Sequence, residues 1–552
     1  MSPSPKLILF ATNIMTETDY DFVVIGSGFG GSTAALRLTE KGHRVLVLEK
    51  GSELTAAQFP KSNWDLRRYM WMPWLGFRGL FKMTFFRHVT VLSGVGVGGG
   101  SLVYACTHPV PKDSFFASTS WAHLADWKNE LAPHYIEAKR MLGVATTPFR
   151  TRTDDVLAQI AIDRGQPEAF EPTEVAVYFG KAGQTVPDPY FGGRGPDRTG
   201  CIRCGGCMLG CRHNAKNTLD KNYLHLARRG GAELQADTEV RSVAPRSEGG
   251  YRVTARVGRY PLFGRSVEYT TRNVIFAGGV LGTVPLLLKL QRDPNALPNL
   301  SPRVGYGIRT NSESLIGVIS RRSEVDLSKG IAIGSILQTD EHSHLEPVRF
   351  SAGSGLFRLL LAPHVGGENI FVRIARLVGA VVRHPLNVLR AFFVRDLSKQ
   401  TTILLYMRTA AGTLRFRRSW TGRLTSDRDV GLAPTASIPE ATELARCVGE
   451  KLDGLPVSLV TETLFNIPTT AHILGGCCMG ASATEGVIDQ DQKILGYEGL
   501  YVMDGSAMSA NPGVNPSLTI VAMTERAVAK IPAAMRAIAN TPSPAALPAA
   551  SA

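Results

Sequence analysis

Four cysteines fall within eleven residues of this 552-residue chain: Cys201, Cys204, Cys207 and Cys211. Their spacing is that of bacterial iron–sulfur ligand runs, except that Arg212 stands where a proline usually follows. Neighbouring glycines would let such a loop fold so that its thiolates converge. Three interpretations stay open: an iron–sulfur centre, a zinc site with four thiolates, and a loop that the thiols only brace.

A second group of residues could bind a dinucleotide. The segment DFVVIGSGFGGSTAALRLTEKGHRVLVLEKG, from residue 21, predicts a strand, a glycine turn, a helix and a second strand. Gly26 would permit the tight turn, Gly28 the approach of a pyrophosphate, and Gly31 the close packing of helix on strand. Glu49, at the end of the second strand, could accept hydrogen bonds from a ribose diol.

Another glycine run, SGVGVGGGSLVYA at 93–105, is too rich in glycine for a stable strand or helix. It favours backbone approach to a large flat ligand. Because no second complete dinucleotide fingerprint is present, the two glycine segments indicate one extended cofactor. This favours FAD over NAD.

These segments and two others resemble the glucose–methanol–choline (GMC) family of flavoprotein oxidoreductases over about residues 19–535. The others are VIFAGGVLGT (274–283) and YVMDGSAMSANPGVNPSLTI (501–520). CIRCGGCMLGCRHNAKNTL, RTNSES, HLEPVR and FNIPTTAHILGGC are most similar to its cholesterol oxidase-like branch. The resemblance implies FAD in one domain and a steroid or other bulky alcohol in the second.

The resemblance also implies roles for individual residues. His472 is placed as the active-site histidine, Asn515 as its partner, and Glu346 as a glutamate that moves a proton during double-bond isomerisation. The residues expected to contact FAD are Gly26, Gly28, Gly31, Glu49, Gly96, Gly98, Gly99, Ser101, Gly278, Asp504, Gly505 and Asn515. We expect the FAD to be bound non-covalently, with His88 as the one doubtful attachment point.

To position these residues, the sequence predicts an α/β chain with a Rossmann-like FAD-binding domain. A substrate domain, built on a mainly antiparallel sheet with helices, is interleaved with it. The FAD-binding domain is assigned to 19–63, 89–110, 212–311 and 485–535. The substrate domain, with the cysteine loop, is assigned to 64–88, 111–211 and 312–484. Residues 1–18 and 536–552 are expected to be flexible ends.

Two segments mix aromatic or apolar residues with basic ones: 64–88 and 370–396. Pro385 should divide the second into two helices. Each segment could be core with snorkelling cations or a surface that touches lipid. The net charge of +14 favours polyanions or anionic membranes, but the cations form no long run, so nucleic acid is not expected as a partner. We expect a cytoplasmic protein, peripheral to a membrane in the second interpretation.

The principal hypothesis is FAD-dependent oxidation of a lipophilic secondary alcohol, foremost a 3-hydroxysteroid, to the ketone, with or without double-bond isomerisation. Alternatives are a ketosteroid desaturase, reductase or isomerase, a GMC enzyme acting on a long-chain alcohol, and a lipid-binding or electron-carrying flavoprotein without turnover. Dioxygen, a redox protein or a quinone could reoxidise the flavin.

Overall fold

The structure is a computed structural model that describes residues 18–534 apart from 260–263, 368, 384, 411 and 432. The expected flexible ends, 1–18 and 536–552, therefore lie outside the described residues except for Thr18.

One sheet carries the dinucleotide-type turn. Its strands run in the order β12-β2-β1-β15-β14-β13, and β25 also pairs with β15. The apolar run of β1 is buried between parallel neighbours β2 and β15, as expected for the centre of a doubly covered sheet. The strands are β1 (Tyr20–Ile25), β2 (Val45–Leu48), β12 (Glu233–Gln235), β13 (Thr238–Pro245), β14 (Tyr251–Val257), β15 (Arg265–Phe276) and β25 (Leu500–Val502).

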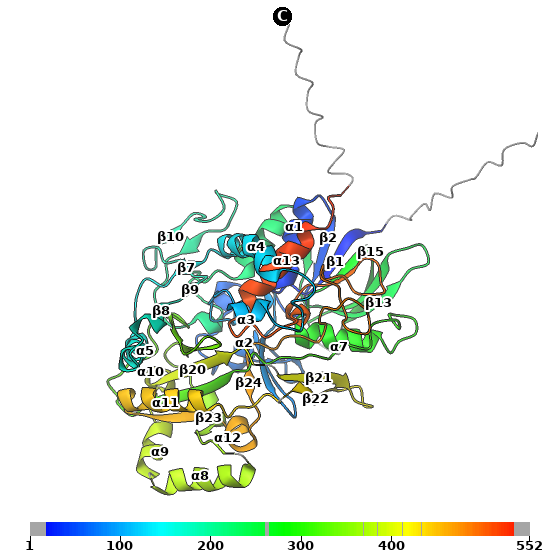
Figure 1. The fold of residues 1–552 in the computed structure, drawn as a ribbon. Coiled ribbons are helices and arrows are strands. Elements are labelled where there is room, and N and C mark those ends of the chain that lie inside the picture. Colours follow the sequence, from blue (N-terminus) through cyan, green and yellow to red (C-terminus); the bar gives the residue numbers. More distant parts are fainter. Residues whose placement is uncertain are drawn as a thin grey trace, which may run out of the picture.

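Helices cover this sheet. Helix α1 (Phe29–Glu40) packs against α6 (Tyr223–Arg229) and α13 (Ser517–Ala529), and α13 packs against α4 (Trp127–Leu142). Helix α7 (Val280–Leu290) follows β15 and contacts β13. Figure 1 shows α1, α4 and α13 together at one end of the molecule. The predicted Rossmann-like α/β fold is confirmed.

The second large sheet is antiparallel throughout, in the order β19-β23-β16-β20-β18-β17-β8. Helix α11 (Pro439–Leu452) packs on β16 and β23, and α5 (Arg152–Asp163) packs on α11 and β17. The strands are β8 (Phe170–Pro172), β16 (Ser314–Ser320), β17 (Ser335–Gln338), β18 (Ser343–Val348), β19 (Leu361–Pro363), β20 (Thr401–Arg408) and β23 (Gly454–Leu459).

A small three-stranded sheet brings distant segments together: β5 (Phe81–Phe85), β6 (Thr90–Gly94) and β24 (Thr469–Thr470). Strand β6 leads into the second glycine run, and β24 ends two residues before His472. Four further short α-helices are α2 (Leu66–Tyr69), α3 (Asp113–Phe116), α10 (Leu397–Gln400) and α12 (Val460–Phe465), and a separate hairpin pairs β21 (Gly412–Arg418) with β22 (Leu424–Gly431).

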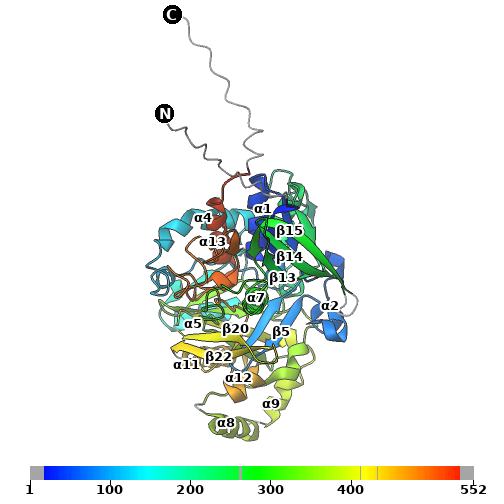
Figure 2. The same cartoon turned by 90° about the vertical axis from the view of Figure 1, so that its right-hand side faces the viewer.

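Helices α8 (Ile370–Arg383) and α9 (Pro385–Phe392) are two consecutive helices at a large angle to each other (Figure 1), and together they form an extension of the second sheet that is called the hairpin below. Pro385 begins α9, so the predicted break is confirmed. In Figures 1 and 2 this hairpin lies at the end of the molecule opposite α1. Within the described part of the chain, no helix is long and apolar enough to cross a bilayer.

Candidate active site

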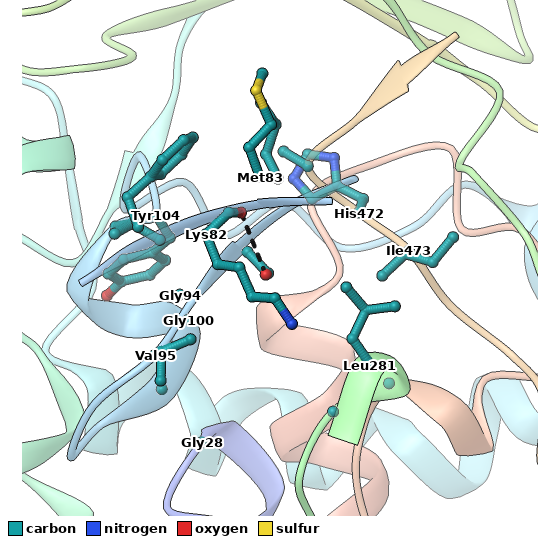
Figure 3. A pocket seen from close by; sticks show the side chains of 18 of the residues that line it. Gly28, Lys82, Met83, Gly94, Val95, Gly100, Tyr104, Leu281, His472 and Ile473 are labelled. Atoms are coloured by element: carbon teal, nitrogen blue, oxygen red, sulfur yellow. Dashed lines mark hydrogen bonds between the residues drawn. The ribbon is translucent and has the colours of Figure 1, made fainter. Parts of the chain in front are cut away.

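A cavity of about 610 Å³ runs from the first glycine turn to the second sheet. One end is lined by Gly28 and Glu49, and the other by apolar side chains of the second sheet and its connections, among them Leu315 and Leu405. His472 and Asn515 also line it. Figure 3 shows the cavity with Gly28 at one end and the His472 ring at the other. The cavity thus joins the two sheets of the fold.

The first glycine turn has the geometry that a phosphate cradle requires. Gly26 has φ +106°, and a Cβ added to it would lie 2.4 Å from the Ala277 carbonyl oxygen. A Cβ on Gly31 would lie 2.1 Å from the Gly26 oxygen, so this position keeps the helix close to the turn. At Gly28, which precedes α1, there is open space where a Cβ would be. The N-terminus of α1 therefore faces the cavity with room for an anion.

The Glu49 carboxylate accepts hydrogen bonds from the protein itself, which the sequence did not predict. Its Oε2 accepts hydrogen bonds from the backbone N–H (3.0 Å) and hydroxyl (2.8 Å) of Ser27, and Oε1 accepts from the Gly51 N–H (2.9 Å). The carboxylate therefore holds the glycine turn in place. Because Glu49 also lines the cavity, the remaining acceptor positions of its carboxylate are available to a ligand that enters it.

The second glycine run packs directly on the first. A Cβ on Gly99 would lie 2.7 Å from the Gly28 Cα, and the Gly98 N–H donates to the Ser27 hydroxyl at 3.1 Å. Ser101 closes the loop by donating to the Gly98 carbonyl at 2.7 Å. Gly99 lines the cavity, whereas Gly96, Gly98 and Ser101 shape the loop behind it.

Asp504 organises a third side of the cavity. Its Oδ2 accepts from the Gly279 N–H (2.8 Å) and the Thr283 hydroxyl at the start of α7, and its Oδ1 accepts from the Ser506 N–H (2.7 Å). Burial raises the pKa of Asp504, although these hydrogen bonds act in the opposite direction. Gly278 and Gly505, beside it, line the cavity as well.

One cationic side chain in the cavity was missed by the sequence analysis. Lys82, on β5, extends into it between Val95 and Leu281 (Figure 3). Burial, together with the nearby Lys50, lowers the pKa of Lys82 to about 8, while Glu239 acts in the opposite direction. The ammonium group forms no hydrogen bond or ion pair with the described residues. It is therefore available to an anionic ligand.

His472 is held by a buried carboxylate. Its Nδ1 lies 2.9 Å from Oε2 of Glu313, a residue with a fully buried side chain. Because a carboxylate only accepts, Nδ1 carries the proton, and the lone pair of the neutral ring is left on Nε2. Burial alone would lower the pKa of His472, but Glu313, with a smaller effect from Glu346, outweighs it and raises the pKa.

Asn515 and Glu346 form a second pair. The Asn515 Nδ2 donates to Oε2 of Glu346 at 3.2 Å, and His344 Nε2 lies 3.3 Å from Oε1 of the same carboxyl group. Glu346 is fully buried on β18 and does not line the cavity; Asn515 does. In this structure Glu346 therefore serves as the hydrogen-bond acceptor of the Asn515 amide, and the part in double-bond isomerisation that the family resemblance implied stays a prediction.

The two pairs are fixed to each other by a strained loop. Asn311 and Ser312, just before Glu313, have φ of +57° and +46°, values that L-residues seldom adopt. The Asn311 side chain accepts from the Gly513 N–H (2.9 Å) and donates to the Val514 carbonyl (3.0 Å). The loop before Glu313 is thus bonded to the loop before Asn515. Strain of this kind persists where surrounding contacts enforce a functional geometry.

Comparison with known proteins agrees with this architecture. The family model described as "GMC oxidoreductase" matches residues 447–524, and a model of an NAD(P)-binding Rossmann-like domain matches 24–68. A cholesterol oxidase of Acinetobacter baumannii is 43% identical over 93% of this chain and 95% of that protein. A cholesterol oxidase of Mycobacterium tuberculosis is also 43% identical, over 94% of this chain and 92% of its own.

The chain belongs to the GMC oxidoreductase family. It is accordingly an FAD-dependent enzyme that oxidises alcohols. The crystal structure of a pyridoxine 4-oxidase from Mesorbium loti shares the fold, with a TM-score of 0.61 at 14% identity over 93% of this chain and 99% of that one.

The GMC cofactor fits the residues present. Gly28 and the N-terminus of α1 would hold the pyrophosphate, Glu49 would meet the ribose, and Lys82 supplies a cation inside the cavity. Asn515 Oδ1 is buried without a hydrogen-bond partner in the described part of the chain, so it can accept from a polar group of cofactor or substrate, or from water. His88, the doubtful attachment point, contacts Ser426 instead and does not line the cavity. Non-covalent binding stays a prediction.

The four-cysteine loop lies apart from the large cavity. Cys201, Cys204, Cys207 and Cys211 line a separate small cavity and carry free thiols. Within the described ranges, no three or more His, Cys, Asp or Glu side chains are arranged to hold a metal ion. The iron–sulfur prediction is therefore not supported, nor is the zinc alternative.

The thiols of the cysteine loop lie in different surroundings. Cys207 is buried, and a hydrogen bond with the Cys106 thiol lowers the pKa of Cys207 to about 6 despite burial, while burial raises the pKa of Cys201 to about 12. Lys216 ties the loop to the cavity wall by donating to the carbonyls of Cys207 (2.8 Å) and Tyr104 (2.9 Å). These bonds brace the loop against the wall of the large cavity.

Glu313 and Lys82 are the functional candidates that sequence reasoning missed. Glu313 lies in RTNSES, which contributed to the family resemblance without a role of its own. An acidic residue just before a buried apolar strand was the available signal. Lys82 gave none, because in sequence it is one of many basic residues among aromatics in 64–88.

Proposed function

We propose that this enzyme oxidises the 3-hydroxyl group of a sterol or related hydroxysteroid to the ketone. The observation that carries the proposal is the 43% identity, over nearly the full length of both chains, to two cholesterol oxidases. The mainly apolar walls of the cavity beyond His472 are compatible with a bulky lipophilic alcohol.

The protein's contribution to the reaction follows from the His472–Glu313 pair. Bound FAD supplies the acceptor for the hydride that leaves the carbinol carbon. Nε2 of the neutral His472 ring accepts the hydroxyl proton, and the Glu313 carboxylate, bonded to Nδ1, stabilises the imidazolium that results. Asn515, held by Glu346, orients the hydroxyl group or the cofactor edge beside it.

We limit the proposal to ketone formation. Isomerisation of a ring double bond needs a base on the cavity wall that can reach two ring carbons, and Glu346 lies behind Asn515.

Anaerobic mixing of the yellow holoenzyme with a panel of compounds tests the substrate. A 3-hydroxysteroid should bleach the flavin and yield the ketone, whereas a 3-ketosteroid should not bleach it. Bleaching by a long-chain primary alcohol but not by the hydroxysteroid would overturn the sterol proposal and favour the long-chain alternative. Subsequent addition of air or of a dye would identify the acceptor.

A further inference from the structure

Helices α8 and α9 turn apolar side chains toward solvent. Exposed residues of this hairpin include Phe371, Ile374, Val378, Val382, Leu389 and Phe393. On α8 the first four are three or four residues apart and so form one stripe along the helix. Phe371 is 79% exposed and Val382 71%. This is the reverse of a helix on a water-exposed surface, whose apolar stripe faces the core.

One arginine of α8, Arg373, faces inward. Arg373 is almost fully buried, and its Nη1 donates to the carbonyls of Glu462 (2.8 Å) and Thr463 (3.1 Å) in α12. Its Nε donates to the Gly367 carbonyl at 2.8 Å. Three bonds to backbone oxygens therefore hold α8 with its apolar stripe outward, so the exposure of that stripe is built into the fold.

The charge of the hairpin is of one sign. Residues 370–395 contain five arginines and no aspartate or glutamate. Arg376, Arg383 and Arg390 are exposed on the same two helices as the apolar stripe. Exposed apolar side chains flanked by cations match the boundary of an anionic bilayer, where acyl chains and negative headgroups lie side by side. A second copy of this surface would bring arginines together and is disfavoured by charge.

The hairpin is attached directly to the substrate end of the cavity. The chain leaves the second sheet through β19, where Leu361 lines the cavity, and returns at Leu397, which also lines it. Both views place α8 at the extreme end of the molecule, away from α1 (Figures 1 and 2). A flat surface can therefore meet the hairpin without contact with the dinucleotide-binding end.

We propose that the outward face of α8 and α9 is a docking surface for an anionic lipid bilayer, on which the hairpin lies in the headgroup region without crossing it. The purpose we assign to it, transfer of a water-insoluble alcohol from bilayer to cavity, rests on the proposed function. The surface itself rests on the exposed stripe, the inward Arg373 and the arginines.

Sedimentation of the holoenzyme with sterol-free vesicles tests the surface. Phosphatidylcholine vesicles containing phosphatidylglycerol should sediment the protein, and more salt should weaken binding. Val378→Asp combined with Val382→Asp should abolish binding, and Arg383→Gln with Arg390→Gln should weaken it roughly tenfold or more. Ile136→Asp is the matched control, because Ile136 is 72% exposed on α4, at the other end of the molecule, and should leave binding unchanged.

Several outcomes would overturn the proposal. Absence of binding to anionic vesicles at low salt is one, and equal binding by the native protein and the aspartate variant is another. A dimer seen by light scattering that the aspartate variant dissociates would assign the face to a second copy instead. Unchanged flavin content and melting temperature show that each variant is folded.

Turnover of a sterol delivered in detergent separates this proposal from the proposed function. If vesicle binding fails while turnover in detergent persists, the docking surface is wrong and the function stands. If vesicles are bound but no hydroxysteroid reduces the flavin, the function is wrong and the surface stands.

Discussion

The Nδ1–H of His472 donates to Oε2 of Glu313 at 2.9 Å, across 159 residues of sequence. This contact fixes the tautomer of the ring, holds Nε2 ready to accept a proton, and raises the pKa of His472 against the effect of burial.

His472→Ala should lower the rate of flavin reduction by an alcohol substrate by about two to four powers of ten, the usual worth of a positioned acid–base group. The FAD content should stay the same, since His472 faces the substrate end of the cavity. Anaerobic stopped-flow absorbance measures the rate. His134→Ala, on α4 and remote from the cavity, is the control; a native rate in the His472 variant would refute the assignment.

Glu313→Gln should move the pH dependence of flavin reduction to lower pH. The Glu313 carboxylate stabilises the imidazolium, so its removal lowers the pKa of His472, and the neutral, proton-accepting ring is then present at lower pH. Rates measured across pH 5 to 9 should show the shift, with a plateau reduced roughly tenfold or more. Glu440→Gln on the surface of α11 should leave the profile unaltered, and an unshifted profile in Glu313→Gln would show that the pair is only structural.

Glu346 should act through Asn515. Glu346→Leu removes the acceptor of the Asn515 amide and should slow flavin reduction roughly tenfold, whereas Glu346→Gln should restore much of the rate because its amide oxygen can still accept. In an Asn515→Ala background, Glu346→Leu should add little further loss. Additive losses would mean that Glu346 has a direct role after all.

Lys82→Met should lower the affinity for FAD by roughly 10- to 100-fold, because it removes a cation that would make a charge-assisted contact with the cofactor. Lys82→Arg keeps the charge and should retain most of the affinity. Titration of apoprotein with FAD, followed by protein fluorescence, gives both values. Equal affinities for the Met variant and the native protein would remove Lys82 from the cofactor site.

Glu462 should make the protein less stable as pH rises. Burial raises the pKa of this carboxyl group to about 8 from an ordinary value of 4.5, so the folded state keeps it neutral after the unfolded state has ionised. The resulting stability is present below pH 4.5 and is lost between pH 4.5 and 8. Glu462→Gln can still accept from the Thr469 N–H and has no such loss. Urea unfolding at pH 5 and pH 8 gives the free energy of unfolding of the Glu462→Gln variant and of the native protein. From pH 5 to pH 8 the difference between them should change by a few kcal/mol in favour of the variant. A difference that does not depend on pH would contradict this.

The dinucleotide-binding end of the molecule could be predicted from the sequence. The glycine turn at Gly26 and Gly28, the helix after it and the acidic residue at Glu49 lie within one short βαβ unit, so local spacing specifies their arrangement. Pro385 likewise specified the break between α8 and α9, because proline acts on its own backbone.

The active-site pairs, the direction of the cysteine side chains and the orientation of α8 depend on the tertiary structure. The His472–Glu313 pair joins the end of one strand to the start of another across the substrate domain, and the side chain of Asn311 secures it to the Asn515 loop. The cysteine spacing allowed convergence on a metal, but packing directs Cys207 toward Cys106 and the cavity wall. The amphipathic pattern of 370–396 did not indicate whether the apolar side faces the core or the solvent. The hydrogen bonds of the buried Arg373 to α12 hold the apolar stripe of α8 toward solvent. Each outcome depends on contacts between residues far apart in sequence, which local spacing does not encode.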